Sequence, residues 1–179
     1  MKNANIMNED ALKATIRSIP DYPQKGILFR DITTLLKDKD AYCALIDAIA
    51  DKLRPLNIDI VIGPEARGFV IGSAVAYAIG AGFVLARKPG KLPCDVISVD
   101  YGLEYGSDCL EIHKDAIRPG MRVAIVDDLL ATGGTAAAVV KLVQDMGAEV
   151  VAAAFAIELE ELNGKSMLGT AEVLSVMKY

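Results

Sequence analysis

The sequence predicts an α/β protein with a central, mainly parallel sheet flanked by helices. Short apolar runs alternate with longer segments of helical periodicity along most of the 179 residues, and this alternation favours a parallel sheet with right-handed crossovers. Residues 123–126 are four apolar residues without charge, typical of a strand buried on both faces. Two aspartates, a turn containing Gly and Thr, and a new helical pattern follow at once. We therefore expect residues 123–135 to organise the fold.

Composition narrows the class of protein. Hydrophobic residues make up 53% and charged residues 24%, as in one compact globular domain over residues 1–179. A net charge of −5 argues against general affinity for nucleic acid or anionic membranes. The uncharged stretch 68–86 is rich in Gly and Ala and divides better into a helix and a strand than into a membrane span. Three scattered cysteines and a single histidine argue against a zinc site or disulfide framework and favour reduced thiols in the cytoplasm.

The first third of the chain contains two predicted helices. An N-cap at Asn8 with apolar residues at helical spacing predicts a first helix that runs as far as Pro20. Residues 21–37 show no periodicity and predict a loop with room for a short strand. Residues 38–53 carry an apolar stripe at helical spacing and predict a helix that ends before Pro55.

The middle of the chain reads as strand, helix and strand over residues 58–62, 69–79 and 83–86. Residues 94–108 combine short apolar runs with Tyr-Gly pairs, which predicts an antiparallel excursion that serves as a lid.

After the organising strand, the pattern predicts a helix that ends at Gly147, a long buried strand over 149–157 and a last strand over 173–177. We expect a hood from about residues 1–35, which together with the lid at 93–108 covers the sheet.

The turn after the organising strand has the composition of an anion site. The unpaired N–H groups at the start of a helix bind phosphate, and glycine lets the backbone come close. Asp127 and Asp128 lie one step upstream, where they can hold vicinal hydroxyls of a sugar. An ordinary turn with solvated acids is the alternative, but the unbroken order favours a ribose 5-phosphate site. Its predicted phosphate-binding residues are Ala131, Thr132, Gly133, Gly134 and Thr135.

Residues 123–135, Val-Ala-Ile-Val-Asp-Asp-Leu-Leu-Ala-Thr-Gly-Gly-Thr, resemble the phosphoribosyl pyrophosphate (PRPP) motif of type I phosphoribosyltransferases. Their form is similar to that of adenine-specific members. The resemblance implies the type I fold with a small hood and a flexible lid loop, and a homodimer. It implies purine salvage, in which adenine and PRPP give AMP and diphosphate. Mg²⁺ would be carried by PRPP, without direct protein ligands, and would meet Asp127 and Asp128 through water at most.

Two further segments follow strand ends in the same predicted sheet. Residues 62–68 offer the forked donor Arg67 for phosphate oxygens, although a plain turn with a surface arginine is as consistent with the residues alone. This segment resembles the family's diphosphate loop, which implies diphosphate binding and catalysis by Arg67 and a cis or strained peptide near Glu65-Ala66.

Residues 87–91 place three cations, Arg87, Lys88 and Lys91, in an acidic protein. A solvated basic turn is common, but its place at a strand end favours diphosphate binding. In some relatives a basic residue reaches the neighbouring subunit, and Arg87 is our first candidate for that role.

The remaining predicted contacts depend on resemblance. Taken alone, residues 101–106 favour a Tyr/Gly turn with an exposed Glu, but they resemble the family's catalytic loop. This implies Glu104 as general acid/base and Tyr105 as the residue that covers the site. Phe29 alone is at least as consistent with core packing. The resemblance implies adenine contacts by Leu28, Phe29, Arg30 and Leu159. His113 is expected on an exposed strand face.

Two rival functions remain. A phosphoribosyltransferase for another base would share residues 131–135 but not the segments around Phe29 and Glu104. A non-catalytic PRPP-sensing protein would also keep the loop, but such regulators usually carry a DNA-binding domain, for which the chain offers no basic helix.

Overall fold

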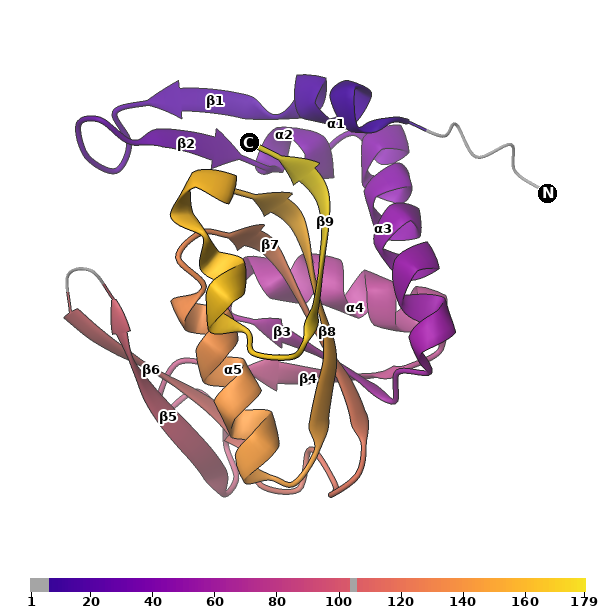
Figure 1. Cartoon of the computed structure of the whole chain (residues 1–179), viewed down its shortest axis with the longest axis vertical. Helices are drawn as coiled ribbons and strands as arrows, with labels where there is room; N and C mark the ends of the chain where they lie inside the picture. Colours follow the sequence, from indigo (N-terminus) through magenta and orange to yellow (C-terminus); the bar gives the residue numbers. More distant parts are fainter. Residues whose placement is uncertain (1–6, 104–105) are drawn as a thin grey trace.

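The computed structural model describes residues 7–103 and 106–179 (Figure 1). Five parallel strands form the central sheet, in the order β4-β3-β7-β8-β9. They are β3 (Ile60–Pro64), β4 (Gly82–Ala86), β7 (Arg122–Leu130), β8 (Glu149–Glu158) and β9 (Glu172–Lys178). The three long helices are α3 (Lys39–Leu53), α4 (Arg67–Ile79) and α5 (Gly134–Asp145). The predicted α/β class and parallel sheet are confirmed.

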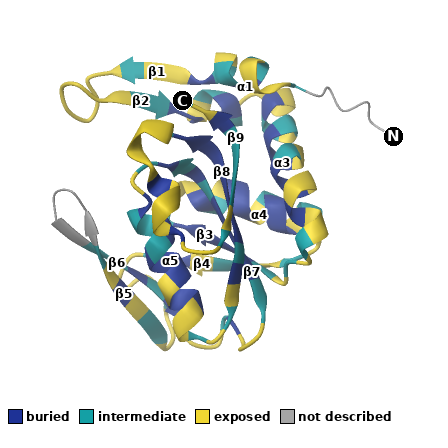
Figure 2. Ribbon diagram, viewed as in Figure 1, coloured by how far each residue is buried: buried dark blue, intermediate teal, exposed yellow. Residues whose placement is uncertain are grey.

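The organising strand β7 is buried on both faces because its side chains alternate between two cores. Val123 and Ile125 pack with α5, whereas Ala124 and Val126 pack with α3 and α4. All four are fully buried, and Figure 2 shows β7 and its neighbouring strands largely dark blue. A continuous apolar run is therefore what this position requires, because neither face of the strand meets water.

The order of the strands fixes where the sheet can hold a ligand. From β3 the chain crosses through α4 to β4, and from β7 it crosses through α5 to β8 on the opposite side. The loops that leave β3 and β7 therefore diverge at the carboxyl ends of two adjacent strands. Such a divergence opens a crevice, which is the usual ligand site of open α/β sheets.

The N-terminal segment differs from its prediction. The first helix, α1 (Glu9–Thr15), ends before Ile16, and β1 (Arg17–Pro20) follows, so the predicted helix up to Pro20 is wrong. β1 pairs antiparallel with β2 (Leu28–Asp31), and this non-local pairing overrides the local helical spacing. The expected loop over 21–37 contains β2 and α2 (Thr33–Leu36). Figure 1 shows the β1–β2 hairpin above the carboxyl ends of the sheet strands.

The predicted antiparallel excursion is a hairpin of β5 (Val96–Leu103) and β6 (Gly106–His113). It packs beside α5 in the core that also contains Val123 and Ile125, with Leu110 and Ile112 buried. His113 is half-buried rather than exposed, and within residues 7–103 and 106–179 its Nε2 atom has no hydrogen-bond partner. The hairpin folds back onto the domain, so the end of β6 is covered.

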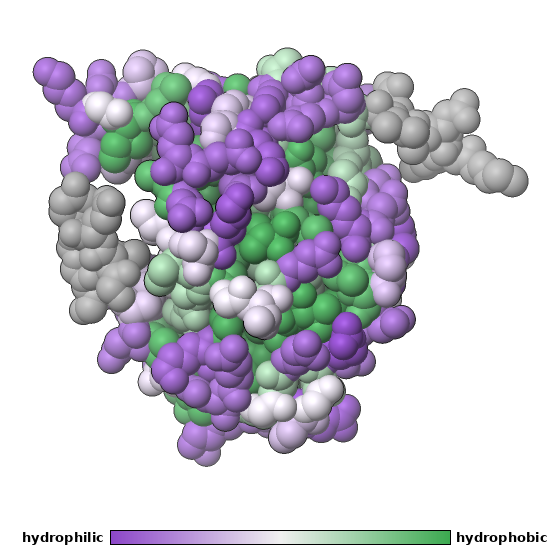
Figure 3. Space-filling model, viewed as in Figure 1, coloured by the Kyte–Doolittle hydropathy of each residue, from purple (hydrophilic) through white to green (hydrophobic). Residues whose placement is uncertain are grey.

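The surface and the helices each show one further property. Figure 3 shows apolar surface gathered over the middle of the viewed face, with polar surface around its rim. No helix in the described part of the chain has the length and apolar character that a membrane crossing needs.

Candidate functional site

A pocket of about 250 Å³ lies where the loops after β3 and β7 diverge. It unites every residue predicted for the 5-phosphate and the ribose with Arg67 of the predicted diphosphate loop. Its walls are formed by Glu65, Ala66, Arg67, the run from Asp127 to Ala136, and Phe155.

The predicted phosphate loop has the backbone of an anion site. Gly133 takes φ +86°, a conformation that favours glycine, and serves as the N-cap of α5. Among the residues that the structure describes, no side chain caps this helix start. The residues of the first turn, from Gly134 to Ala136, line the pocket. Their N–H groups therefore have no acceptor within the helix, and the helix dipole favours an anion there.

The two predicted ribose acids lie within β7, near its carboxyl end, because the strand continues to Leu130. Asp128 is buried, with 6% of its surface exposed. Asp127 accepts a hydrogen bond from the backbone N–H of Asp128 at 2.8 Å. Burial and, next, the negative charge of Asp128 raise the pKa of Asp127 well above its usual range. The two carboxyl groups therefore lie side by side in different surroundings, and only Asp128 forms an ion pair.

The partner of Asp128 is Arg67, the first residue of α4, whose Nε donates to a carboxylate oxygen. Burial by itself would lower the pKa of Arg67, but the negative charge of Asp128 opposes it and the pKa is raised. The peptide bond between Glu65 and Ala66, just before α4, is cis, as the resemblance implied. Arg67 therefore bridges the ends of β3 and β7.

The basic segment after β4 is held by a carboxylate that sequence reasoning did not select. Glu65 accepts hydrogen bonds from Arg87 Nε at 3.2 Å and from Lys91 Nζ at 3.0 Å. The backbone N–H of Lys88 donates to the same carboxylate at 3.1 Å. The Lys88 N–H and then the Lys91 ammonium hold the pKa of Glu65 at about 2. Glu65 was recognisable only as part of the diphosphate-loop motif, because the residues it binds lie more than twenty positions downstream.

The third cation of this segment contacts the hairpin. Lys88 Nζ lies 2.9 Å from Asp108 Oδ2 on β6, and the Tyr101 hydroxyl donates to Asp108 at 3.3 Å. Burial raises the pKa of Tyr101, and hydrogen bonding with Thr135 acts in the opposite direction. The hairpin thereby contacts the basic segment, and its strand β5 packs beside α5, the helix that follows the predicted phosphate loop. The predicted catalytic residues Glu104 and Tyr105 lie outside the described residues.

A second pocket, of about 270 Å³, lies under the β1–β2 hairpin. Phe29 and Arg30 line it, and the Phe29 ring meets the Tyr22 ring edge-to-face at a centroid distance of 5.1 Å. Leu28 is 47% exposed and Leu159 packs against the core on the α3 and α4 face. Neither belongs to this pocket's wall, so the structure places two of the four predicted adenine contacts there. Its walls are formed by Ile19, Tyr22, Phe29, Arg30, Asp31, Ile32, Thr33 and Arg67.

Arg30 is directed by two partners that lie outside the predicted set. Its Nη1 donates to the Ser18 hydroxyl at 2.6 Å, and its guanidinium lies 4.0 Å from the centroid of the Tyr179 ring. A cation over an aromatic face is attracted by the ring quadrupole. The last residue of the chain therefore helps to hold one wall of the second pocket.

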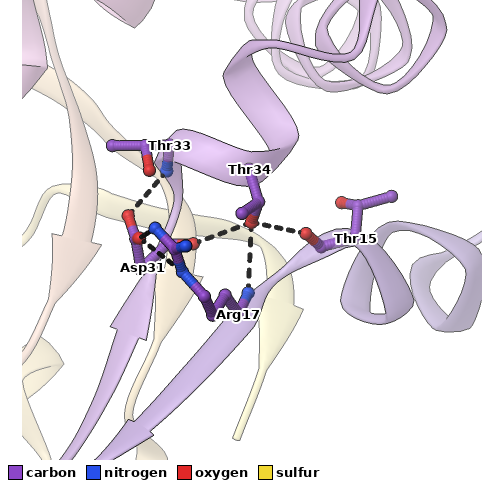
Figure 4. A network of polar contacts seen from close by, with 5 residues as sticks. All are labelled: Thr15, Arg17, Asp31, Thr33 and Thr34. Atoms are coloured by element: carbon purple, nitrogen blue, oxygen red, sulfur yellow. Dashed lines mark hydrogen bonds and ion pairs between the residues drawn. The ribbon is translucent and has the colours of Figure 1, made fainter.

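Asp31 fixes the hairpin to α2 (Figure 4). It accepts from Arg17 Nε at 3.0 Å and from the backbone N–H of Thr33 at 2.9 Å. The Thr34 hydroxyl donates to the carbonyl of Thr15 at 2.6 Å and accepts from the Arg17 N–H. Hydrogen bonds from Thr33 and then Arg17 lower the pKa of the buried Asp31 to about 2. This network supports the pocket wall that carries Phe29 and Arg30.

Comparison with known proteins agrees with this geometry. The model of the phosphoribosyl transferase domain family matches residues 31–166. The adenine phosphoribosyltransferase of Alkaliphilus metalliredigens is 60% identical over 168 residues, which cover 94% of this chain and 99% of that protein. That of Clostridium acetobutylicum is 56% identical over 94% of this chain and 98% of that protein.

Solved structures are similar over the same extent. Adenine phosphoribosyltransferase from Thermoanaerobacter pseudethanolicus superposes with a TM-score of 0.93 at 49% identity, covering 96% of this chain and 100% of the other. The Saccharomyces cerevisiae enzyme, solved with adenine and an iminoaltritol bisphosphate, gives a TM-score of 0.90 at 41% identity, covering 94% and 97%.

Proposed function

Since the chain belongs to the phosphoribosyl transferase domain family, we propose that it is an adenine phosphoribosyltransferase, an enzyme of purine salvage. It transfers the 5-phosphoribosyl group from PRPP to adenine and releases AMP and diphosphate. Similarity to adenine phosphoribosyltransferases extends over nearly the whole chain. One observation carries the site assignment: Arg67 lines both the phosphate-ribose pocket and the pocket that holds Phe29. A sugar in the first pocket and a base in the second would meet beside this residue.

The ribose 5-phosphate of PRPP is seated on the β7 side of the crevice in this proposal. The N–H groups at the start of α5 and the hydroxyls of Thr132 and Thr135 donate to the phosphate. Asp127 and Asp128 accept hydrogen bonds from the ribose hydroxyls and lie beside the positive charge that develops on the sugar ring.

The diphosphate end of PRPP is held by Arg67, Arg87, Lys88 and Lys91. Each of these cations has a carboxylate partner in this structure: Asp128 for Arg67, Glu65 for Arg87 and Lys91, and Asp108 for Lys88. Binding of PRPP is therefore an exchange of anions, in which phosphate oxygens replace or share the donors that carboxylates hold. These cations can therefore stabilise the leaving diphosphate, and before PRPP binds each of them is paired with a carboxylate.

Transfer breaks the bond between the anomeric carbon and a diphosphate oxygen and forms a bond from that carbon to a ring nitrogen of adenine. The bonding electrons leave with diphosphate, and the proton on the purine ring passes to Glu104 as general base. Tyr105 covers the site and helps to exclude water. The base itself is held against Phe29, with Leu28, Arg30 and Leu159 as further contacts.

The residues present fit a metal that arrives with PRPP. Within the described residues, no three His, Cys, Asp or Glu side chains are grouped to hold a metal ion, and Asp128 is already paired with Arg67. Mg²⁺ prefers a partly hydrated octahedral shell and is commonly shared with substrate phosphates. Asp127 and Asp128 would hold it through water. Bound to PRPP, the ion supplies charge neutralisation for diphosphate.

The enzyme forms a homodimer in this proposal. α4 and the edge strand β4 expose large apolar side chains, among them Tyr77 at 91% and Leu85 at 39%. Burying such side chains favours association. Cys43, Cys94 and Cys109 are all free, which suits the reducing cytoplasm.

A panel of bases tests the activity. Adenine, hypoxanthine, guanine, xanthine and orotate are each supplied with PRPP and Mg²⁺, and diphosphate release and nucleotide formation are followed. We expect turnover with adenine, and its loss when Mg²⁺ is chelated. Turnover with another base but not adenine would contradict the specificity, and PRPP binding without turnover on any base would indicate a sensor.

A further inference from the structure

The predicted phosphate loop packs directly against a glycine from a distant part of the chain. Gly164 begins the short 3₁₀ helix η3 (Gly164–Met167) between β8 and β9, and it is buried. A Cβ atom added to Gly164 would lie 2.2 Å from the Ala131 carbonyl oxygen and 2.9 Å from the Gly133 nitrogen. The contact is reciprocal, because a Cβ atom on Gly133 would lie 2.4 Å from the Gly164 carbonyl oxygen.

These approaches leave no room for a side chain on either partner. Separations under 3.0 Å are essentially never seen for a real Cβ atom, and the opposing atoms at Gly164 belong to the loop backbone. They cannot be relieved by turning a flexible side chain, so a methyl group at Gly164 must displace the loop, the helix η3 or both. Gly164 itself lies outside the left-handed region of φ. An alanine there adds steric volume without strain in its own backbone.

The segment around η3 also packs against α5, the helix that begins at the predicted phosphate loop. Leu168, directly after η3, is buried in the same core as Ala136 and Val139 of α5. Figure 1 shows the short helices between β8 and β9 beside the start of α5. The loop is thus held between its own helix and the backbone of η3, which follows the carboxyl end of the neighbouring strand β8.

We propose that Gly164 is a positioning residue for the 5-phosphate of PRPP. Its missing side chain lets η3 pack on the backbone of residues 131–133, and this contact holds the N–H groups of the loop in the geometry that receives the phosphate. The inference rests on the proposed function, because it assumes that this loop binds that phosphate. It predicts that Gly164 affects the phosphate end of the substrate and leaves the diphosphate end and the base unaffected.

The test compares Gly164→Ala with Lys165→Ala, an exposed change in the same 3₁₀ helix. We expect Gly164→Ala to raise the KM for PRPP about tenfold or more, equivalent to about 1.4 kcal/mol, with the KM for adenine within about twofold. Inhibition by ribose 5-phosphate weakens in parallel, whereas inhibition by diphosphate does not change. Lys165→Ala should match the wild type in all four quantities.

Several results would overturn the inference. An unchanged KM for PRPP in Gly164→Ala, or equal losses for ribose 5-phosphate, diphosphate and adenine, would reduce Gly164 to general packing. If the wild type fails to turn over adenine, the proposed function fails, and binding of ribose 5-phosphate still tests the contact.

A measurement on the wild type keeps the inference testable should the variant not fold. In amide hydrogen exchange, saturating ribose 5-phosphate should increase protection of residues 131–135 and of residues 163–168 together. Protection of the loop without any change at residues 163–168 would count against a coupled support.

Discussion

Arg67 at the start of α4 and Asp128 near the end of β7 form an ion pair across the boundary where the crossovers of the sheet diverge. The carboxylate is buried while about half of the arginine side chain is exposed. An anion arriving from solvent therefore meets the exposed guanidinium first. The pair fixes the arginine in place before the ligand binds, which lowers the entropic cost of organising the site.

Arg67→Lys should lower kcat/KM by about a hundredfold. A lysine keeps the charge but loses the planar fork that can serve a carboxylate and a phosphate oxygen together. Initial rates over a range of PRPP concentrations measure the effect. Arg54→Lys, at an exposed pair with Asp51 remote from the pocket, is the control and should leave the rates unchanged. Equal rates for Arg67→Lys and the wild type would show that only charge matters at this position.

Glu104→Gln should lower kcat by about a hundredfold, the scale of general acid–base catalysis, and leave PRPP affinity within about twofold. The amide has nearly the same shape but cannot take the purine proton. Rapid-quench turnover and calorimetric titration with PRPP separate the two effects, and Glu161→Gln on the exposed surface is the control. A comparable loss of PRPP binding would show that Glu104 contributes to binding PRPP, and would contradict its role as the acceptor of the purine proton.

Phe29→Ala should raise the KM for adenine about tenfold with little change in the KM for PRPP. Loss of the ring removes a stacking surface from the pocket under the hairpin and the edge-to-face contact with Tyr22. Leu28→Ala is a matched comparison, because this neighbour is 47% exposed and lies outside the pocket wall. In steady-state kinetics, a larger adenine effect for Leu28 than for Phe29 would show that the base binds elsewhere on the hairpin.

Asp31→Asn should lower stability at neutral pH by about 1 kcal/mol and flatten its acid dependence. The folded-state pKa of Asp31 is about 2, below the ordinary value of 3.8, so the folded protein binds this proton less readily than the unfolded chain. The stabilisation is present above about pH 4 and is lost as pH falls toward 2.

Urea unfolding at pH 7, 4 and 3 measures this difference. Asp145→Asn, which removes an exposed i,i+4 pair with Lys141 on α5, is the control and should change stability by only a few tenths of a kcal/mol. Identical acid dependence in Asp31→Asn and the wild type would contradict the assigned role of the Figure 4 network.

Local signals were sufficient for most of the sheet and for the centre of the site. Every residue of the run Val123–Val126 is apolar because the strand lies between two cores, so its burial could be predicted from the sequence alone. The turn from Ala131 to Thr135 was equally readable, because a glycine in the left-handed region and a helix start are local properties. The end of the first helix at Thr15 could not be predicted locally, because β1 gains its hydrogen bonds from β2, where Pro20 pairs with Leu28 and Arg17 with Asp31.

By itself the sequence determined the alternation of strands and helices, the acid pair, the turn predicted to bind phosphate and the basic segment, since each depends on residues adjacent in the chain. Only the tertiary structure decided which charges meet and which backbones touch. Glu65 holds Arg87 and Lys91, Asp31 holds Arg17, and Gly164 supports the loop of Gly133. These contacts join segments that the strand order brings together, and their strength depends on distances of an ångström or less, which spacing along a chain does not encode.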